Sequence, residues 1–194
     1  MDTHSPVEAR EMVAPKTLES QLREMYGRAA YTHKTHEKMA DSYIRRYGLI
    51  KGFEIALSAL ATTSLIIAVF GDSHAGVIVG AILSTALLAI TLYFKEASLG
   101  EQSQKHTVIA SKLWGIREQL LSLLVDMSDA RSIDEIRQER DRLNLALEDI
   151  YKHAPRTNNA AYKSAQQALK ANEELFFTDE ELNKMLPKKL RIRS

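Results

Sequence analysis

Four consecutive residues have side chains or backbone freedom that could serve chemistry: Gly71, Asp72, Ser73 and His74. A carboxylate and an imidazole after an apolar segment could hold the metal ions of a phosphoesterase, and an Asp-Ser pair could carry the nucleophile of a serine hydrolase. Either site needs partners elsewhere in the chain. No Gly-Asn-His segment follows, and Asp149 and His153 are spaced wrongly for a late Asp-x-x-His pair. We therefore expect no catalytic residue and no enzyme, and interpret the four residues as a turn.

The charges of the chain are distributed unevenly. The 194 residues include 26 Lys and Arg and 25 Asp and Glu, which gives a net charge of +1. From Ile55 to Phe94 the only Asp, Glu, Lys or Arg is Asp72, whereas both flanks are dense in charge of both signs. Intermixed charges favour no nucleic-acid patch, so we expect no direct nucleic-acid binding. Without cysteine there is no disulfide or thiolate zinc site, and we expect no metal and no cofactor.

The uncharged middle is long enough to cross a bilayer twice. At about 1.5 Å per residue, Ile55–Phe70 and Ala75–Phe94 reach roughly 24 and 30 Å as helices, against a hydrocarbon thickness of about 30 Å. We predict transmembrane helices over residues 53–71 and 75–94. A buried helical hairpin of a soluble protein has the same periodicity and is the alternative interpretation. The second stretch lacks a polar face, which favours the membrane.

Basic residues set the expected orientation of the two spans. They flank the pair on one side only, at Arg45, Arg46, Lys51 and Lys95. Because Lys and Arg concentrate in cytoplasmic segments, we expect a multi-pass protein with both termini in the cytoplasm. A charge at the bilayer centre costs roughly 2.5 to 3.5 kcal/mol, so the turn that contains Asp72 should lie at the outer surface.

The flanking segments have the periodicity of long amphipathic helices, so the predicted fold class is all-α. We predict a flexible N-terminus over residues 1–16, cytoplasmic helices over 17–52 and 95–128, further helices over 132–187, and a basic tail over 188–194. Apolar and aromatic positions recur at steps of three and four, and they are Leu18, Leu22, Met25, Ala29, His36, Met39, Tyr43 and Tyr47 before the spans, and His106, Ile109, Leu113, Ile116, Leu120, Leu124 and Met127 after them.

Two Ser/Thr-x-x-Glu patterns have the form of capping boxes and mark expected helix starts. Ser132 and Glu135 precede a helix from about Ile133 to His153, and Thr178 with Glu181 precedes another. Pro155 should separate the first of these from a helix over about Thr157–Leu175. The tight turn makes the spans antiparallel, so the two cytoplasmic helices can pack as a coiled-coil-like pair.

Other residues of the flanks could be taken for metal ligands or for a stacking platform. His33 and His36 lie about one helical turn apart, with Glu37 beside them, but a third ligand at a compatible position is lacking. We interpret them as part of a solvated or interfacial helix face. Trp114 could offer a stacking platform, and we interpret it as core packing.

The order of these elements, together with three segments, is similar to one known family. The segments are HEKMADSYIRRY before the first span, KEASLGEQSQKHTVIASKLWGIREQLLSL after the second, and LEDIYKHAPRTNNAAYKSAQQAL at Leu147–Leu169. The chain resembles the SLATT family over about Leu18–Arg191. These two-transmembrane effector domains associate with SMODS nucleotidyltransferases and SLOG nucleotide-sensing domains in bacterial conflict systems. The resemblance implies an effector of an anti-phage system in the bacterial inner membrane. It also implies a separate sensor or nucleotide-signal-producing protein as partner.

The spans themselves suggest how such an effector would act. A small-residue stripe of Gly76, Gly80 and Ser84 could bring helices of several copies together, or could pack the hairpin within one chain. The hydroxyl groups of Ser58, Thr62 and Thr63 could line an opening, or could bond to their own helix backbone. Two spans enclose no water, so permeabilising the lipid bilayer would require a homo-oligomer. The alternative function is a membrane-anchored scaffold or sensor subunit that conducts nothing.

Overall fold

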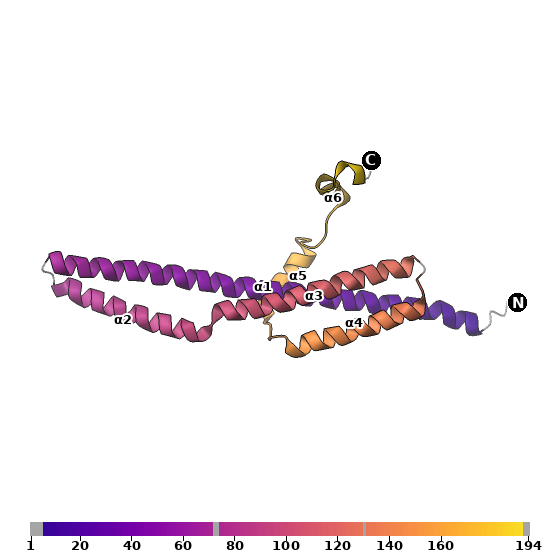
Figure 1. The fold of residues 1–194 in the computed structure, drawn as a ribbon, viewed down its shortest axis with the longest axis horizontal. Coiled ribbons are helices and arrows are strands. Elements are labelled where there is room, and N and C mark those ends of the chain that lie inside the picture. Colours follow the sequence, from indigo (N-terminus) through magenta and orange to yellow (C-terminus); the bar gives the residue numbers. More distant parts are fainter. Residues whose placement is uncertain (1–5, 72–73, 130, 192–194) are drawn as a thin grey trace. The chain divides into compact units, whose positions relative to one another are not determined.

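The computed structural model describes residues 6–71, 74–129 and 131–191, and side chains from Thr17 onward, with the exception of Leu190. Within these ranges the chain is helical and has no strand, which confirms the all-α prediction. The elements in Figure 1 are α1 Pro6–Phe70, α2 His74–Ala97, α3 Leu99–Ser128, α4 Ile133–His153, α5 Asn159–Lys170, α6 Asp179–Met185 and the 3-10 helix η1 Lys188–Leu190.

The first predicted span continues the helix that precedes it, and the second is followed by a break. α1 is one helix through both the predicted cytoplasmic segment and the first span, and it begins at Pro6, eleven residues before the expected start at residue 17. α2 ends at Ala97 and α3 begins at Leu99. Ser98 between them has φ 39°, in the left-handed region that non-glycine residues seldom adopt. This break was not among the features predicted from the sequence.

The C-terminal helices begin where the sequence predicts, although only one capping box forms. At Thr178 the box is complete, because its hydroxyl oxygen accepts from the Glu181 backbone N–H while the Glu181 carboxylate accepts from Thr178. Ser132 makes no side-chain bond to α4, so the predicted box at this position is wrong. α5 runs over Asn159–Lys170, a shorter range than predicted, and its cap is Asn158, whose side chain accepts from the Ala161 N–H.

The chain divides into two compact units, and the first comprises residues up to Lys38 and from Ala110 onward. Its core joins α1, α3, α4 and α5, and its fully buried side chains include Leu22, Met25, Leu113, Leu120, Leu123, Ile136, Leu143 and Ala165. Leu123 takes the core position that the sequence analysis assigned to Leu124. α5 buries one alanine face (Ala161, Ala165, Ala168) and stacks Tyr162 on Tyr31 of α1 with 6.1 Å between ring centroids.

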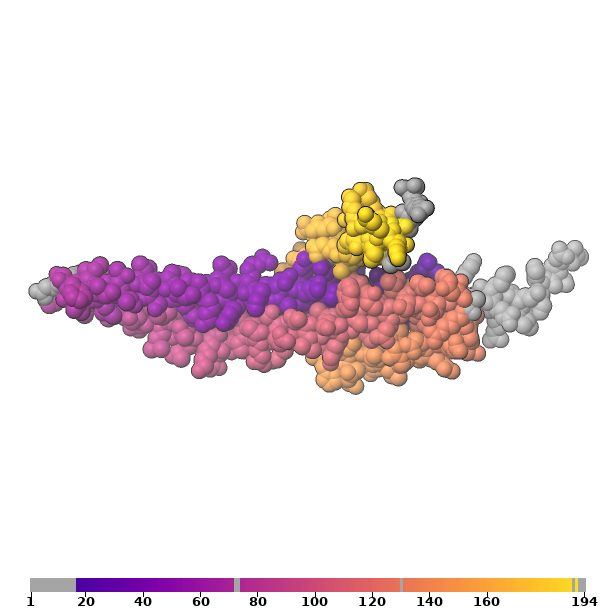
Figure 2. All heavy atoms as spheres, turned by 45° about the horizontal axis from the view of Figure 1, so that its top comes forward, coloured from indigo at the N-terminus to yellow at the C-terminus, as the bar shows by residue number. Residues whose placement is uncertain are grey.

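Two lysines of α1 hold the segment that follows α5 within the same unit. Lys34 Nζ lies 2.8 Å and Lys38 Nζ 3.2 Å from Glu174 Oε2. Figure 2 shows the orange-to-yellow atoms of this C-terminal segment against violet atoms of α1. Two cations on one carboxylate hold its pKa at about 2, well below its ordinary value of 4.5.

The second unit, residues 39–109, contains both predicted spans and the helical segments next to them. Below the spans, Ser103 Oγ donates a 3.0 Å hydrogen bond to the Ala40 carbonyl, and His106 stacks on Tyr43 with 5.6 Å between ring centroids. Burial lowers the pKa of His106 below its ordinary value of 6.5. These contacts place the start of α3 beside α1 within this unit.

Candidate functional site

α1 and α2 pack against each other along a seam of positions less exposed than their neighbours. The seam positions recur at alternating steps of four and three, and they are Ile50, Glu54, Leu57, Ala61, Ser64 and Ala68 on α1, and Gly76, Gly80, Leu83, Leu87, Ile90 and Phe94 on α2. This spacing keeps one face of each helix toward the other. The predicted antiparallel hairpin is therefore built by packing within one chain.

Two residues of the small stripe lie in this seam. A Cβ atom on Gly76 would come within 2.9 Å of the Ser64 carbonyl oxygen and 3.1 Å of Ala68 Cβ. On Gly80 it would come within 2.9 Å of Leu65 Cδ2. The glycines thus let α2 approach α1 within the hairpin, which is the packing alternative left open by the sequence.

Ser84 does not share the packing role of the two glycines. A strict four-residue stripe drifts around a helix, and the seam instead steps by three from Gly80 to Leu83. Ser84 is exposed, and it lies seven residues, about two turns, before Thr91 on the same flank of α2. Ser84 therefore takes no part in the packing within the hairpin, and its predicted role in contacts between copies stays a prediction.

The outward faces of the hairpin are apolar and uncovered. Large side chains are exposed along both helices, among them Ile55, Leu60, Ile67, Phe70, Ile78, Ile82, Leu88 and Leu92. In the described residues, two helical stretches are long and apolar enough to cross a membrane, and only 11% and 6% of their most apolar windows are buried. A core helix of a soluble protein is mostly buried, so the soluble-bundle alternative does not fit these exposures.

Two of the hydroxyl groups that could line an opening donate hydrogen bonds to the backbone of their own helix. Thr62 Oγ1 donates to the Ser58 carbonyl and Thr63 Oγ1 to the Ala59 carbonyl, both at 2.9 Å. The hydroxyl hydrogens of these two threonines are therefore used in bonds to their own helix backbone, which is one of the two alternatives stated from the sequence. Each hydroxyl oxygen keeps acceptor lone pairs, however, and both side chains are exposed.

Several of the exposed hydroxyls lie together on one side of the hairpin, whereas Thr85 lies outside this group. A shallow groove of about 720 Å³ is lined by Lys51, Glu54, Ile55, Ser58, Ala59, Thr62, Thr63, Leu87 and Thr91. Glu54, Ser58 and Thr62 follow one another at four-residue steps on α1, and Thr91 joins them from α2. We call Glu54, Ser58, Thr62 and Thr91 the polar face. Glu54 and Thr91 were not among the predicted site residues, although the four-residue spacing from Glu54 to Thr62 is a signal from which Glu54 could have been predicted.

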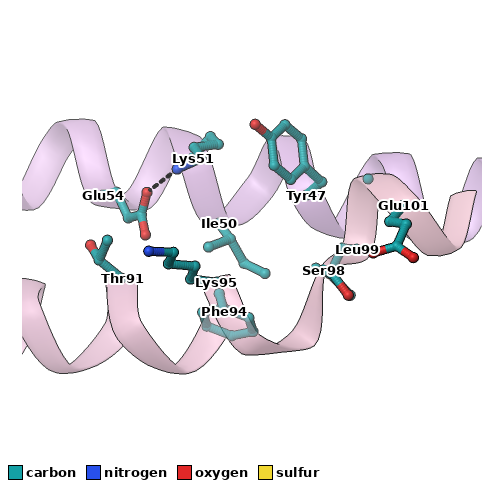
Figure 3. A pocket seen from close by; sticks show the side chains of 11 residues that line it. Tyr47, Ile50, Lys51, Glu54, Thr91, Phe94, Lys95, Ser98, Leu99 and Glu101 are labelled. Carbon is teal, nitrogen blue, oxygen red and sulfur yellow. Dashed lines mark hydrogen bonds and ion pairs between the residues drawn. The ribbon is translucent and has the colours of Figure 1, made fainter.

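Charged groups lie at one end of the polar face, where the apolar spans end (Figure 3). Lys51 Nζ donates a 2.8 Å hydrogen bond to Glu54 Oε2, and this bond raises the pKa of Lys51. Figure 3 shows the Thr91 hydroxyl beside the Glu54 carboxylate and the Lys95 side chain extending toward both. Arg45 and Arg46, the other residues of the predicted basic flank, are exposed on α1.

The turn at the other end is only partly described. Gly71 N donates a 2.8 Å hydrogen bond to the Ile67 carbonyl, and a Cβ at Gly71 would come within 2.7 Å of that oxygen. His74 begins α2 and is exposed. Asp72 and Ser73 lie outside the described residues, so their predicted place in an external turn stays a prediction.

The residues of the flanks that could be taken for ligands are engaged in packing. His33 Nδ1 bonds to the Ala110 carbonyl at 2.9 Å, and both His33 and His36 are buried. The face that carries them is therefore interfacial and not solvated. Trp114 is 43% exposed, so its assignment to the core is wrong. Its ring packs on the Arg117 guanidinium, 3.8 Å from the ring centroid, and lies 5.5 Å from the His33 ring.

Comparison with known proteins identifies a family over most of the chain. The model of the family described as SMODS and SLOG-associating 2TM effector domain family 4 matches residues 18–181. That range includes both helices of the hairpin and α3, α4 and α5. Neither a curated protein nor a solved structure matches the chain significantly.

Proposed function

We propose that this chain, which belongs to the SMODS and SLOG-associating 2TM effector domain family, permeabilises or depolarises the bacterial inner membrane as an oligomer. Its place in the membrane follows from the family and from the two exposed apolar helices. Its action as a pore is our inference. A separate protein that senses infection, or that makes a nucleotide signal, would trigger the opening.

The polar face is the observation that carries this proposal. Ser58, Thr62 and Thr91 offer oxygen atoms on a side of the hairpin that would otherwise face lipid tails, and the buried Glu54 carboxylate lies at the end of this row. Polar groups in hydrocarbon are unfavourable unless they find polar partners. When several hairpins turn these faces toward a common axis, the hydroxyl oxygens can meet water and ions instead.

The remaining parts of the proposal follow from charge and from the first unit. Basic residues near the end of the spans that carries Lys51 and Lys95 favour a cytoplasmic location for both termini. The helices of the first unit would then be accessible to a cytoplasmic sensor, which could bias the assembly between closed and open arrangements. No catalytic step is part of this mechanism.

A matched pair of substitutions tests the role of the polar face. Thr62→Val removes a hydroxyl from the groove, and Thr85→Val removes one from α2 outside the residues that line it. Thr85 is an apt control because it is also exposed and its hydroxyl donates to a carbonyl four residues back, at 2.9 Å, as in Thr62. We expect Thr62→Val to reduce depolarisation, measured with a potential-sensitive dye in expressing bacteria, while Thr85→Val keeps it.

The scaffold remains the alternative function, and the same measurements distinguish it. A chain that fractionates with the membrane but causes no depolarisation, even with its triggering partner present, would support the scaffold. If wild type and Thr62→Val depolarise the membrane equally, the chain still forms a pore, but the polar face does not line it. Particle imaging of the purified chain in detergent gives the number of copies directly.

A further inference from the structure

A cavity of about 300 Å³ lies at the charged end of the hairpin, where α2 gives way to α3 (Figure 3). α1 contributes Tyr47, Ile50, Lys51 and Glu54 to it, α2 contributes Thr91, Phe94 and Lys95, and the break with the first residues of α3 contributes Ser98, Leu99, Gly100 and Glu101. A volume of this size is at the lower end of the range for small-molecule sites. Every lining residue belongs to the unit of residues 39–109.

Two lysines and two glutamates line the cavity, and within the described residues Lys95 is the one of the four that forms no ion pair. Lys51 and Glu54 neutralise each other across their 2.8 Å ion pair. Glu101 pairs at 2.7 Å with Lys105, which is not among the lining residues, and Figure 3 shows the Glu101 side chain directed away from Lys95. The ammonium group of Lys95 is therefore the cation of the cavity that is free to meet an anionic ligand.

The position of the cavity points to the headgroup layer of the membrane. It lies at the end of the exposed apolar helices, next to Tyr93 and Phe94, whose rings pack edge to face with 5.1 Å between centroids. Aromatic rings of this kind are enriched at membrane–water interfaces. The lipid phosphates lie in the same layer, and basic pockets between transmembrane helices bind anionic headgroups.

We propose that this cavity binds the phosphodiester headgroup of an anionic phospholipid, with Lys95 as the main contact. The ammonium group of Lys95, which forms no ion pair within the described residues, complements the net −1 of a phosphatidylglycerol, whereas phosphatidylcholine is neutral as a whole. A lipid fits better than free phosphate because the cavity shares Lys51, Glu54 and Thr91 with the groove along the spans. An acyl chain attached to the headgroup can therefore follow the hairpin into the hydrocarbon.

Lipid titration of the purified full chain tests the proposal. We would titrate the protein in a mild non-ionic detergent with dioleoyl phosphatidylglycerol or dioleoyl phosphatidylcholine and count bound lipids by native mass spectrometry. Lys95→Gln should weaken phosphatidylglycerol binding about fivefold, the factor expected for one lysine near an anionic headgroup. Lys112→Gln is the control, since it removes an equal charge from an exposed position of α3 outside the cavity.

A second variant separates headgroup binding from a merely structural role of the charged cluster. Glu54→Gln removes one of the two carboxylates that line the cavity and frees the charge of Lys51, so phosphatidylglycerol should bind more tightly, opposite to the effect of Lys95→Gln. Damage to the hairpin would weaken binding in both variants. Wild-type binding by Lys95→Gln, an equal loss in Lys112→Gln, or displacement of the lipid by millimolar inorganic phosphate would each overturn the proposal. Because binding is measured in detergent, the result is independent of whether the protein forms a pore.

Discussion

Replacing Glu174 with glutamine should loosen the C-terminal segment from α1 in the first unit. The carboxylate is contacted by Lys34 at 2.8 Å and Lys38 at 3.2 Å, and the side chains of Lys34 and Glu174 are only 11% and 32% exposed. The fall of the Glu174 pKa from 4.5 to about 2 sets an upper limit of about 3 kcal/mol on the contribution of the two lysines. Since solvent screens a third of the side chain, we expect about 2 kcal/mol.

Hydrogen exchange of the backbone amides of α5 measures this effect where it should occur. A loss of about 2 kcal/mol makes exchange through opening of the segment about 30-fold faster at neutral pH. The control is Glu180→Gln, which breaks the Lys184–Glu180 ion pair of equal length, 2.8 Å, whose side chains are 72% and 80% exposed. An exposed pair of this kind contributes at most about 0.5 kcal/mol, so exchange should change about twofold or less.

The pH dependence has a definite sign. Because the folded chain depresses the pKa of Glu174, the stabilisation is complete above pH 4.5 and is lost as the pH falls toward 2. Glu174→Gln should remove this acid-induced loosening. If exchange in α5 is unchanged in Glu174→Gln, or changes as much in Glu180→Gln, then burial does not strengthen this pair and the reasoning is refuted.

Two further predictions concern the hairpin and the buried histidine of the second unit. Gly76→Ala should destabilise the hairpin by about 1 to 2 kcal/mol, because its new methyl group meets the Ser64 carbonyl oxygen. Gly115→Ala is the control, because a Cβ atom at Gly115 would have no neighbour within 4 Å. This substitution should stabilise α3 by up to about 1 kcal/mol, since alanine favours a helix more than glycine does. Distances between spin labels on the two spans of this cysteine-free chain should broaden in Gly76→Ala, and thermal unfolding reports on Gly115→Ala. Because burial lowers the pKa of His106, which stacks on Tyr43, stability should fall as the pH drops below 6.5. Melting curves of His106→Gln should lack this slope, and an unchanged slope would exclude His106 as its cause.

The hairpin was predictable because the information for it is local in the sequence. An uncharged stretch interrupted by four turn-forming residues specifies two spans, and the regular steps from Leu18 to Met39 identify positions that the structure buries. The capping box at Thr178 also lies within four residues of sequence. Such signals can be interpreted without knowing which distant residues pack against the segment.

Other features depend on tertiary context and left no comparable signal. Glu174 meets Lys34 across 140 positions of sequence, and many other acidic residues could have done so. The four-residue stripe places Ser84 with Gly76 and Gly80, whereas the packing of α2 on α1 within the hairpin follows alternating steps of four and three. The exposure of Trp114 follows from where Arg117 and His33 lie, which the spacing of aromatic residues does not reveal. The polar face likewise emerged only when Thr91 was brought beside α1.

The break at Ser98 makes the two legs of the hairpin mechanically unequal. α1 stays helical past this level and resists bending, whereas the other leg contains a residue held at φ 39°. A serine in that conformation stores roughly 1 to 3 kcal/mol of strain, which straightening would release. If α2 moves, we therefore expect the chain to bend at Ser98, while α1 stays straight and α2 turns relative to it.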